Sequence, residues 1–160
     1  MKTELKVGST APVFSALAVG GPYGDGNEVS LMQFRGQTVV LYFYPKDDTP
    51  GCTRQACGLR DSWADFFGRV QIFGVSIDPA KSHRKFIEKH SLPFPLLVDE
   101  DHAIVEAYGV WIEKSMYGKT YMGTERTTFV IGPDGKVAAI LRKVNPSEHA
   151  SRLHEVLETL

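Results

Sequence analysis

Residues 38–44 read Thr-Val-Val-Leu-Tyr-Phe-Tyr, a continuous run of β-branched and aromatic side chains. Such a run fits a strand that is covered on both faces, as in the middle of an α/β sheet. A second run of this kind spans residues 70–77. The order strand, helix, strand predicts a βαβ unit with parallel strands. The helix is indicated by apolar residues at spacings of three and four, namely Ala56, Leu59, Trp63 and Phe66.

Further elements follow this unit along the chain. Asp78 can cap a helix that has Pro79 at its first position and extends to His90. Residues 94–98 predict a short strand, and residues 103–108 a brief helix capped from the acidic run 99–101. Two apolar segments then flank Gly-Pro-Asp-Gly, a strong turn signal, and predict a hairpin with strands at 127–131 and 137–141.

The chain is expected to end in a capped helix. Asn145 and Pro146 would supply the cap and the first turn, and Glu148 the acid of a capping box. A βαβ unit followed by an antiparallel hairpin and a terminal helix is the arrangement of thioredoxin-like domains. We therefore predict an α/β thioredoxin-like fold, a central mixed β-sheet flanked by helices, in one domain over residues 1–160. The apolar stripe of the terminal helix would contain Ala150, Leu153, Val156 or Leu157, and Leu160.

Charge and length limit the partners of this chain. Its 160 residues carry 18 Lys and Arg against 19 Asp and Glu, a formal net charge of −1. This balance provides no general attraction to nucleic acid or to an anionic membrane, so we expect neither as a partner. The first ten residues contain no apolar core of a signal peptide, and no later run approaches the roughly 20 residues that span a bilayer. We expect a cytoplasmic protein.

The loop at residues 45–53 carries the chemistry, with the sequence Pro-Lys-Asp-Asp-Thr-Pro-Gly-Cys-Thr. Cys52 falls in the first turn of the predicted helix, where free backbone N–H groups and the helix dipole favour an anion such as a thiolate. Pro50 and Gly51 suit a sharp entry into the helix. Cys52 could instead be a small core residue beside a turn, and its placement alone leaves both interpretations open.

A longer match points to the reactive cysteine. Residues 42–53, with Cys57 five positions after Cys52, resemble the peroxiredoxins of the bacterioferritin-comigratory-protein or Q type. The resemblance extends in order to Gly-Val-Ser at 74–76, Phe-Pro-Leu at 94–96, Tyr-Gly-Lys at 117–119 and Arg-Thr-Thr-Phe-Val-Ile at 126–131. It implies a thiol peroxidase that reduces hydrogen peroxide and organic hydroperoxides, is recycled by thioredoxin or a similar dithiol, and is a monomer without cofactor or metal.

The same resemblance assigns roles to individual residues. Cys52 would be the peroxidatic cysteine, with Pro45 shielding the thiolate from water and the Thr49 hydroxyl bonding the sulfur and the peroxide. Arg126 would place its guanidinium beside both. Relatives usually carry Glu three residues after the peroxidatic cysteine, where this chain has Gln55. The Gln55 amide can still hydrogen-bond Arg126, but it does not offset the charge of that guanidinium.

Cys57 is the resolving cysteine by this resemblance. Five helical positions separate Cα atoms by roughly 8 to 9 Å, whereas a disulfide requires less than about 7 Å. A Cys52–Cys57 bond therefore requires the first turns of the helix to unwind, which Gly58 would ease. The alternative is that Cys57 has no partner and that the protein is a one-cysteine peroxidase.

Other functions fit the sequence less well. A disulfide reductase of the thioredoxin type has two residues between its cysteines, and this pair has four. A structural zinc site needs four ligands, and the five histidines show no paired spacing with the cysteines, so we expect surface or helix positions for them. A thiol-based redox sensor or binding module without rapid turnover remains the alternative from another class. Structural roles are expected for the aromatic cluster Trp63, Phe66 and Phe67, and solvent exposure for Lys46, Asp47 and Asp48.

Overall fold

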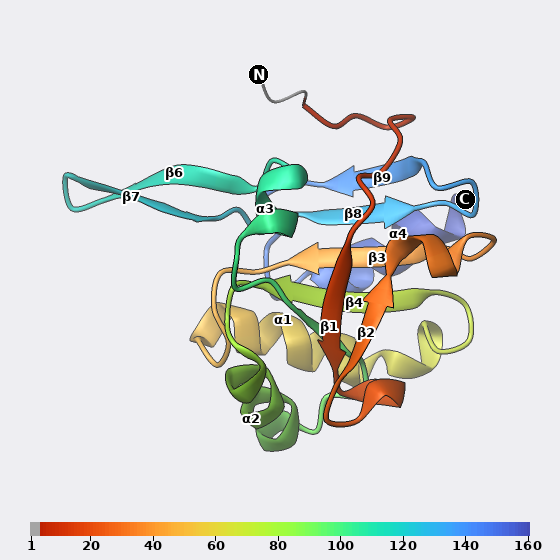
Figure 1. Cartoon of the computed structure of the whole chain (residues 1–160), viewed down its shortest axis with the longest axis horizontal. Coiled ribbons are helices and arrows are strands. Elements are labelled where there is room, and N and C mark those ends of the chain that lie inside the picture. Colours follow the sequence, from red (N-terminus) through yellow and green to blue (C-terminus); the bar gives the residue numbers. More distant parts are fainter. Residues whose placement is uncertain (1–3) are drawn as a thin grey trace.

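The computed structural model describes residues 4–160 and contains a seven-stranded sheet with the strand order β2-β1-β5-β4-β3-β8-β9 (Figure 1). The strands of this sheet are β1 (Ser15–Val19), β2 (Asn27–Ser30), β3 (Val39–Phe43), β4 (Gln71–Ser76), β5 (Leu96–Val98), β8 (Thr128–Ile131) and β9 (Val137–Leu141). A separate two-stranded ribbon is formed by β6 (Trp111–Met116) and β7 (Lys119–Thr124). The helices are α1 (Pro50–Asp61), α2 (Ala80–His90), α3 (Ala103–Ala107) and α4 (His149–Glu158), with short 3-10 helices η1 (Gly21–Tyr23), η2 (Leu31–Phe34) and η3 (Trp63–Asp65).

The centre of the sheet confirms the predicted βαβ unit. Strands β3 and β4 are parallel and are joined through α1, and β5 extends the parallel part. Strands β8 and β9 form the predicted hairpin, and β8 pairs antiparallel with β3. This mixed sheet flanked by helices is the thioredoxin-like fold that the sequence predicts.

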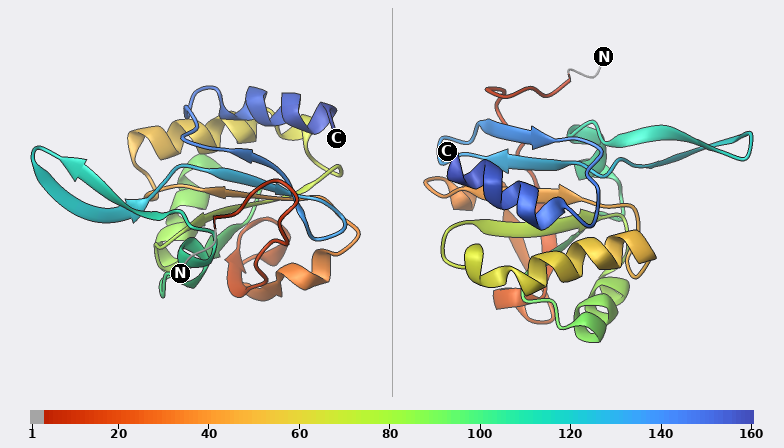
Figure 2. Two further views of the ribbon diagram at one scale, coloured as in Figure 1. Left: turned by 90° about the horizontal axis from the view of Figure 1, so that it is seen from above. Right: turned by 180° about the vertical axis from the view of Figure 1, so that it is seen from behind.

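Two apolar cores cover the faces of the sheet, because alternate residues of a strand point to opposite sides. In β3, Leu41 and Phe43 belong to the core that includes α3, whereas Val40 and Tyr42 belong to the core that includes α1, α2 and α4. Helices α1 and α4 lie side by side on this second face (Figure 2). The face under α1 is the one that receives Cys52.

Two predicted helix stripes were partly wrong. Helix α1 ends at Asp61, and Trp63 lies in the following 3-10 helix η3. The apolar spacing of three and four residues therefore extends past the end of the helix. Phe66 is fully buried as expected, but Phe67 is 72% exposed. In α4, Leu153 and Leu157 are buried, whereas Leu160 lies beyond the helix and is 62% exposed.

The predicted caps of α2 and α4 were wrong, because the side chains bond elsewhere. Pro79 takes the N-cap position of α2, and Asp78 instead accepts hydrogen bonds from the Ser76 hydroxyl and the Asp47 backbone N–H. Asn145 accepts from the backbone N–H of Ser147, and α4 begins only at His149. The cap of α3 is confirmed, since both carboxylate oxygens of Asp99 accept from backbone N–H groups in its first turn.

Two strand pairs lack a clear signal in the sequence. Strands β1 and β2 pair antiparallel around the turn at residues 20–26. The ribbon β6–β7 extends away from the body of the protein (Figure 1), and its turn contains Tyr117 and Gly118, both with positive φ. Its strands are largely exposed, so they carry no alternating apolar pattern from which the sequence could predict them.

His149 at the start of α4 is a fully buried histidine. Its ring lies against Tyr42, and its Nε2 shares a 2.8 Å hydrogen bond with the Thr128 hydroxyl. Burial, and next the positive charges of Arg126 and Arg152, lower the pKa of His149 from 6.5 to about 3. The imidazole is therefore neutral in the folded protein, whereas it gains a proton readily in the unfolded chain.

This difference predicts a loss of stability in acid. Above pH 6.5 both states hold a neutral His149, and the unfolded state binds the extra proton as the pH falls toward 3. The free energy of unfolding of the wild type should therefore fall relative to that of His149→Gln, by about 1.4 kcal/mol per pH unit within this interval. Denaturant unfolding of both proteins along a pH series measures the difference. A difference in the free energy of unfolding that stays constant between pH 6.5 and 3 would contradict the lowered pKa of His149.

Candidate active site

The candidate site is built where β3 leaves the sheet. The chain turns through residues 45–49 and enters α1, with Thr49 as N-cap residue and Pro50 as the first helical residue. Cys52 is the third residue of the helix, so its sulfur lies near the first-turn N–H groups, which have no partner within the helix, and near the positive end of the dipole. Cys52 is only 2% exposed.

Arg126 reaches this sulfur from the segment that precedes β8, the neighbour of β3 in the sheet. The pairing of β3 with β8 places Tyr42 opposite Thr128, and the Phe43 N–H donates to the Thr127 carbonyl, so Arg126 lies beside the end of β3. Its Nη1 donates to Cys52 Sγ at 3.4 Å. A guanidinium at this distance supplies the positive charge and the N–H donor that a thiolate nucleophile needs.

Two neighbours explain why the guanidinium fits there. A Cβ atom on Gly51 would lie 3.1 Å from Arg126 Nη2, so the missing side chain leaves room for the arginine at the helix start. Gln55, one turn after Gly51 and fully buried, accepts from Arg126 Nη1 at 2.7 Å through its Oε1. The expected amide contact with Arg126 is thus present, and among residues 4–160 no carboxylate forms an ion pair with this guanidinium.

The other expected pocket residues lie in the loop itself. Thr49 and Pro45 are both half-buried. The Thr49 hydroxyl donates to the Lys46 carbonyl at 2.9 Å, so its proton closes the loop in this state and its oxygen is left to accept. Pro45 directly follows Tyr44, the last residue of the apolar run.

Cys57 lies on the same helix as Cys52. Helix α1 is continuous from Pro50 to Asp61, both cysteines are free thiols, and Cys57 is half-buried. The helical separation expected from the sequence therefore holds in this state, and the two sulfurs stand too far apart along the helix for a bond.

The sequence missed several groups around the loop. Asp47, expected in solvent, is 7% exposed and bonds Tyr44, Ser82 and His83. The five histidines were expected on the surface or in helices; His83 lies in α2, but its side chain is fully buried. No local pattern marks a buried polar pair whose members are 36 residues apart.

Lys114 on β6 is a further cation near the site that the sequence did not indicate. Its Nζ donates to the Thr124 carbonyl at 2.6 Å, and the side chain is half-buried. Burial, and next the positive charge of Arg126, lower the pKa of Lys114. The base of the β6–β7 ribbon therefore contributes to the electrostatics around Arg126.

A thioredoxin-like fold with a buried cysteine at a helix N-terminus and an arginine on its sulfur defines the class of thiol peroxidases. The AhpC/TSA family model matches residues 7–140. The chain belongs to this family, within its Bcp or Q-type peroxiredoxins, and is a thiol peroxidase.

Individual relatives match over nearly the full length. The chain is 45% identical to peroxiredoxin Bcp of Bacillus subtilis over 98% of this chain and 95% of that protein. It is 47% identical to peroxiredoxin Bcp of Escherichia coli over 91% of this chain and 90% of that protein. The solved bacterioferritin comigratory protein of Xanthomonas campestris, studied for alkyl peroxide reduction, aligns with a TM-score of 0.84 and 35% identity over 97% of this chain and 96% of that chain. Among residues 4–160, no helix has the length and apolar character needed to cross a membrane.

Proposed function

We propose that Cys52 is the peroxidatic cysteine of this thiol peroxidase and that it reduces hydrogen peroxide and organic hydroperoxides. The observation that carries the proposal is the Arg126 guanidinium on Cys52 Sγ at the start of α1. Alkyl peroxide reduction by the Xanthomonas campestris relative supports the inclusion of organic substrates.

The first step is a displacement at oxygen. The Cys52 thiolate attacks one peroxide oxygen, the O–O bond breaks, and the departing oxygen takes a proton to leave as water or alcohol. The sulfur keeps the attacked oxygen as a sulfenic acid. Negative charge develops on the departing oxygen, and Arg126 together with the first-turn N–H groups of α1 can stabilise it. Thr49 and Pro45 would line the approach of the peroxide, the hydroxyl as a hydrogen-bonding group and the ring as a barrier to water.

Cys57 resolves the sulfenic acid in a second step. The Cys57 thiolate attacks Cys52 Sγ, the S–O bond breaks, and hydroxide leaves as water with a proton, which forms an intramolecular disulfide. The first turns of α1 must unwind for this attack, because a continuous helix holds the two residues about 8 to 9 Å apart at Cα. An external dithiol of the thioredoxin type then supplies two electrons and restores both thiols. We infer a monomer in the cytoplasm, where such dithiols are kept reduced.

Cys57→Ser is expected to separate the two steps. The variant should consume one equivalent of peroxide at the wild-type rate, because Cys52 and its surroundings are intact, and then stop in assays driven by thioredoxin. The expected loss of thioredoxin-supported turnover is about 100-fold or more, since no disulfide is formed for the dithiol to reduce. Rapid mixing with peroxide and the coupled oxidation of NADPH measure the two steps. Undiminished turnover would show that Cys57 has no resolving role.

The test of the whole proposal is peroxide-dependent oxidation of NADPH in the presence of thioredoxin and thioredoxin reductase. We expect sustained consumption with hydrogen peroxide and with an alkyl hydroperoxide. A single oxidation of Cys52 without sustained consumption would instead indicate a redox sensor.

A further inference from the structure

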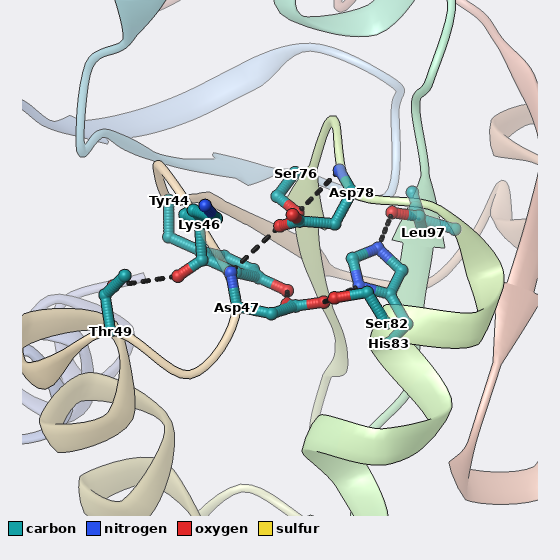
Figure 3. A network of polar contacts seen from close by, with 9 residues as sticks. All are labelled: Tyr44, Lys46, Asp47, Thr49, Ser76, Asp78, Ser82, His83 and Leu97. Atoms are coloured by element: carbon teal, nitrogen blue, oxygen red, sulfur yellow. Dashed lines mark hydrogen bonds and ion pairs between the residues drawn. The ribbon is translucent and has the colours of Figure 1, made fainter.

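A buried polar network ties residues 45–49, which we call the active loop, to α2, β4 and β5 (Figure 3). Its centre is the carboxylate of Asp47, which is two residues before Thr49. Asp47 Oδ1 accepts from the Tyr44 hydroxyl at 2.6 Å, and Oδ2 accepts from the Ser82 hydroxyl at 2.8 Å. His83 Nδ1 lies 2.7 Å from the same Oδ2. Both carboxylate oxygens are thus engaged below the surface of the protein.

The contact of the second ring nitrogen of His83 shows where the protons of the His83–Asp47 pair lie. Nε2 lies 2.8 Å from the carbonyl oxygen of Leu97, which can only accept, so Nε2 carries a hydrogen. Nδ1 would then face the carboxylate with a bare lone pair unless one more proton lies between them. The 2.7 Å contact therefore requires a shared proton, as in an imidazolium–carboxylate pair.

The contact between Asp47 and His83 joins residues 45–49 to a helix and a strand elsewhere in the chain. His83 is on α2 and Leu97 on β5, so the Asp47 side chain is anchored to both. The Asp47 backbone N–H also donates to Asp78 Oδ2 at 2.9 Å, and Asp78 accepts from the Ser76 hydroxyl at the end of β4. The side chain of Asp47 is therefore tied directly to α2 and through His83 to β5, and its backbone is tied through Asp78 to the end of β4.

A metal ion is not needed to explain the cluster. Ligand-type atoms of Asp47, Asp78 and His83 lie within 4.8 Å of one another. The Asp47 and Asp78 oxygens, however, accept hydrogen bonds from protein donors, and both His83 nitrogens have protein partners. Both Asp47 oxygens, Asp78 Oδ2 and both His83 nitrogens are therefore already engaged by protein groups.

Resting on the proposed function, we propose that Asp47 and His83 are positioning residues of the peroxidase site. Their contact holds residues 45–49 in the one arrangement that sets Pro45 and Thr49 around Cys52. The loop has no other fully buried side-chain anchor among the described residues, because Lys46 and Asp48 are exposed and Asp48 pairs with the exposed Lys89 and the half-buried His90. Loss of the buried pair would leave Cys52 on α1 and Arg126 beside it, but would free the loop that completes the pocket.

The test measures the second-order rate constant of Cys52 with hydrogen peroxide in a single turnover, at a temperature where each variant is folded. Asp47→Ala and His83→Leu should each lower this constant by about 10-fold or more, since displacements of the order of 1 Å in a catalytic group are costly. Asp47→Asn should stay within about threefold of the wild type, because its amide can donate to a neutral His83 and still accept from Tyr44. Tyr44→Phe keeps the ring in the core and removes one hydrogen-bond donor to Asp47. Its rate constant should therefore fall between those of Asp47→Asn and Asp47→Ala.

Two controls separate positioning from stability and from the proposed function. Val39→Ala removes buried apolar volume at the opposite end of β3, so it should lower the thermal stability and leave the rate constant unchanged. Wild-type protein that fails to react with peroxide would refute the proposed function itself. Wild-type protein that reacts, together with folded Asp47→Ala, His83→Leu and Tyr44→Phe that react within about twofold of it, would overturn only the positioning role.

Discussion

Cys52→Ser is expected to abolish peroxide reduction while the fold is retained. The hydroxyl of serine is a far weaker nucleophile than a thiolate, so the rate should fall by at least about 1000-fold, to the background of the assay. Serine matches cysteine closely in size, and Cys52 packs at the edge of the core formed by α1, α2 and α4, so the structural change is small. Peroxide consumption with dithiothreitol as reductant measures the loss without dependence on a protein partner.

Cys57→Ser is the matched control for this experiment, because it removes the other cysteine of the same helix. With dithiothreitol it should retain turnover, since the small dithiol can reduce the sulfenic acid directly. Retained turnover in Cys52→Ser would refute the assignment of the peroxidatic residue. Loss in both variants with dithiothreitol would show that both cysteines are needed before any reductant acts.

Arg126→Ala is expected to have the second largest effect. The variant keeps the cysteine at the helix start but loses the cation that donates to its sulfur at 3.4 Å. Removal of one preorganised donor to a developing oxyanion typically costs about 100- to 1000-fold in rate, and we expect a loss of this size in the reaction of Cys52 with peroxide. Rapid-mixing kinetics at several peroxide concentrations give the second-order rate constant.

Arg69→Ala is the control for charge, because Arg69 forms an exposed ion pair with Glu158 on the surface. It should react with peroxide like the wild type. Arg126→Lys should recover only part of the rate, since an ammonium keeps the charge but cannot donate to Cys52 and Gln55 through one planar group. Wild-type kinetics in Arg126→Ala would show that the guanidinium only packs against the sulfur.

The sequence by itself determined the centre of this protein. The apolar run ending at Tyr44 and the stripe through Ala56 and Leu59 are local patterns. The backbone geometry of a strand or a helix sets which residues share a face, whatever that face packs against. The position of Cys52 near the start of α1 follows from the same local pattern. The helix ends were less well determined, because Asp78 and Asn145 bond to other partners than the helices they were expected to cap.

Only the tertiary structure decided how the site is completed. Arg126 is 74 residues from Cys52, and it reaches the sulfur because β8 pairs with β3 in one particular register. The resemblance to relatives predicted that contact, but no spacing in the sequence did. His83 and Asp47 meet across 36 residues because α2 packs beside the active loop, and nothing in the sequence separated this buried pair from surface charges. Periodicity records which face of an element is apolar, whereas the partner of a polar group depends on the packing of whole elements.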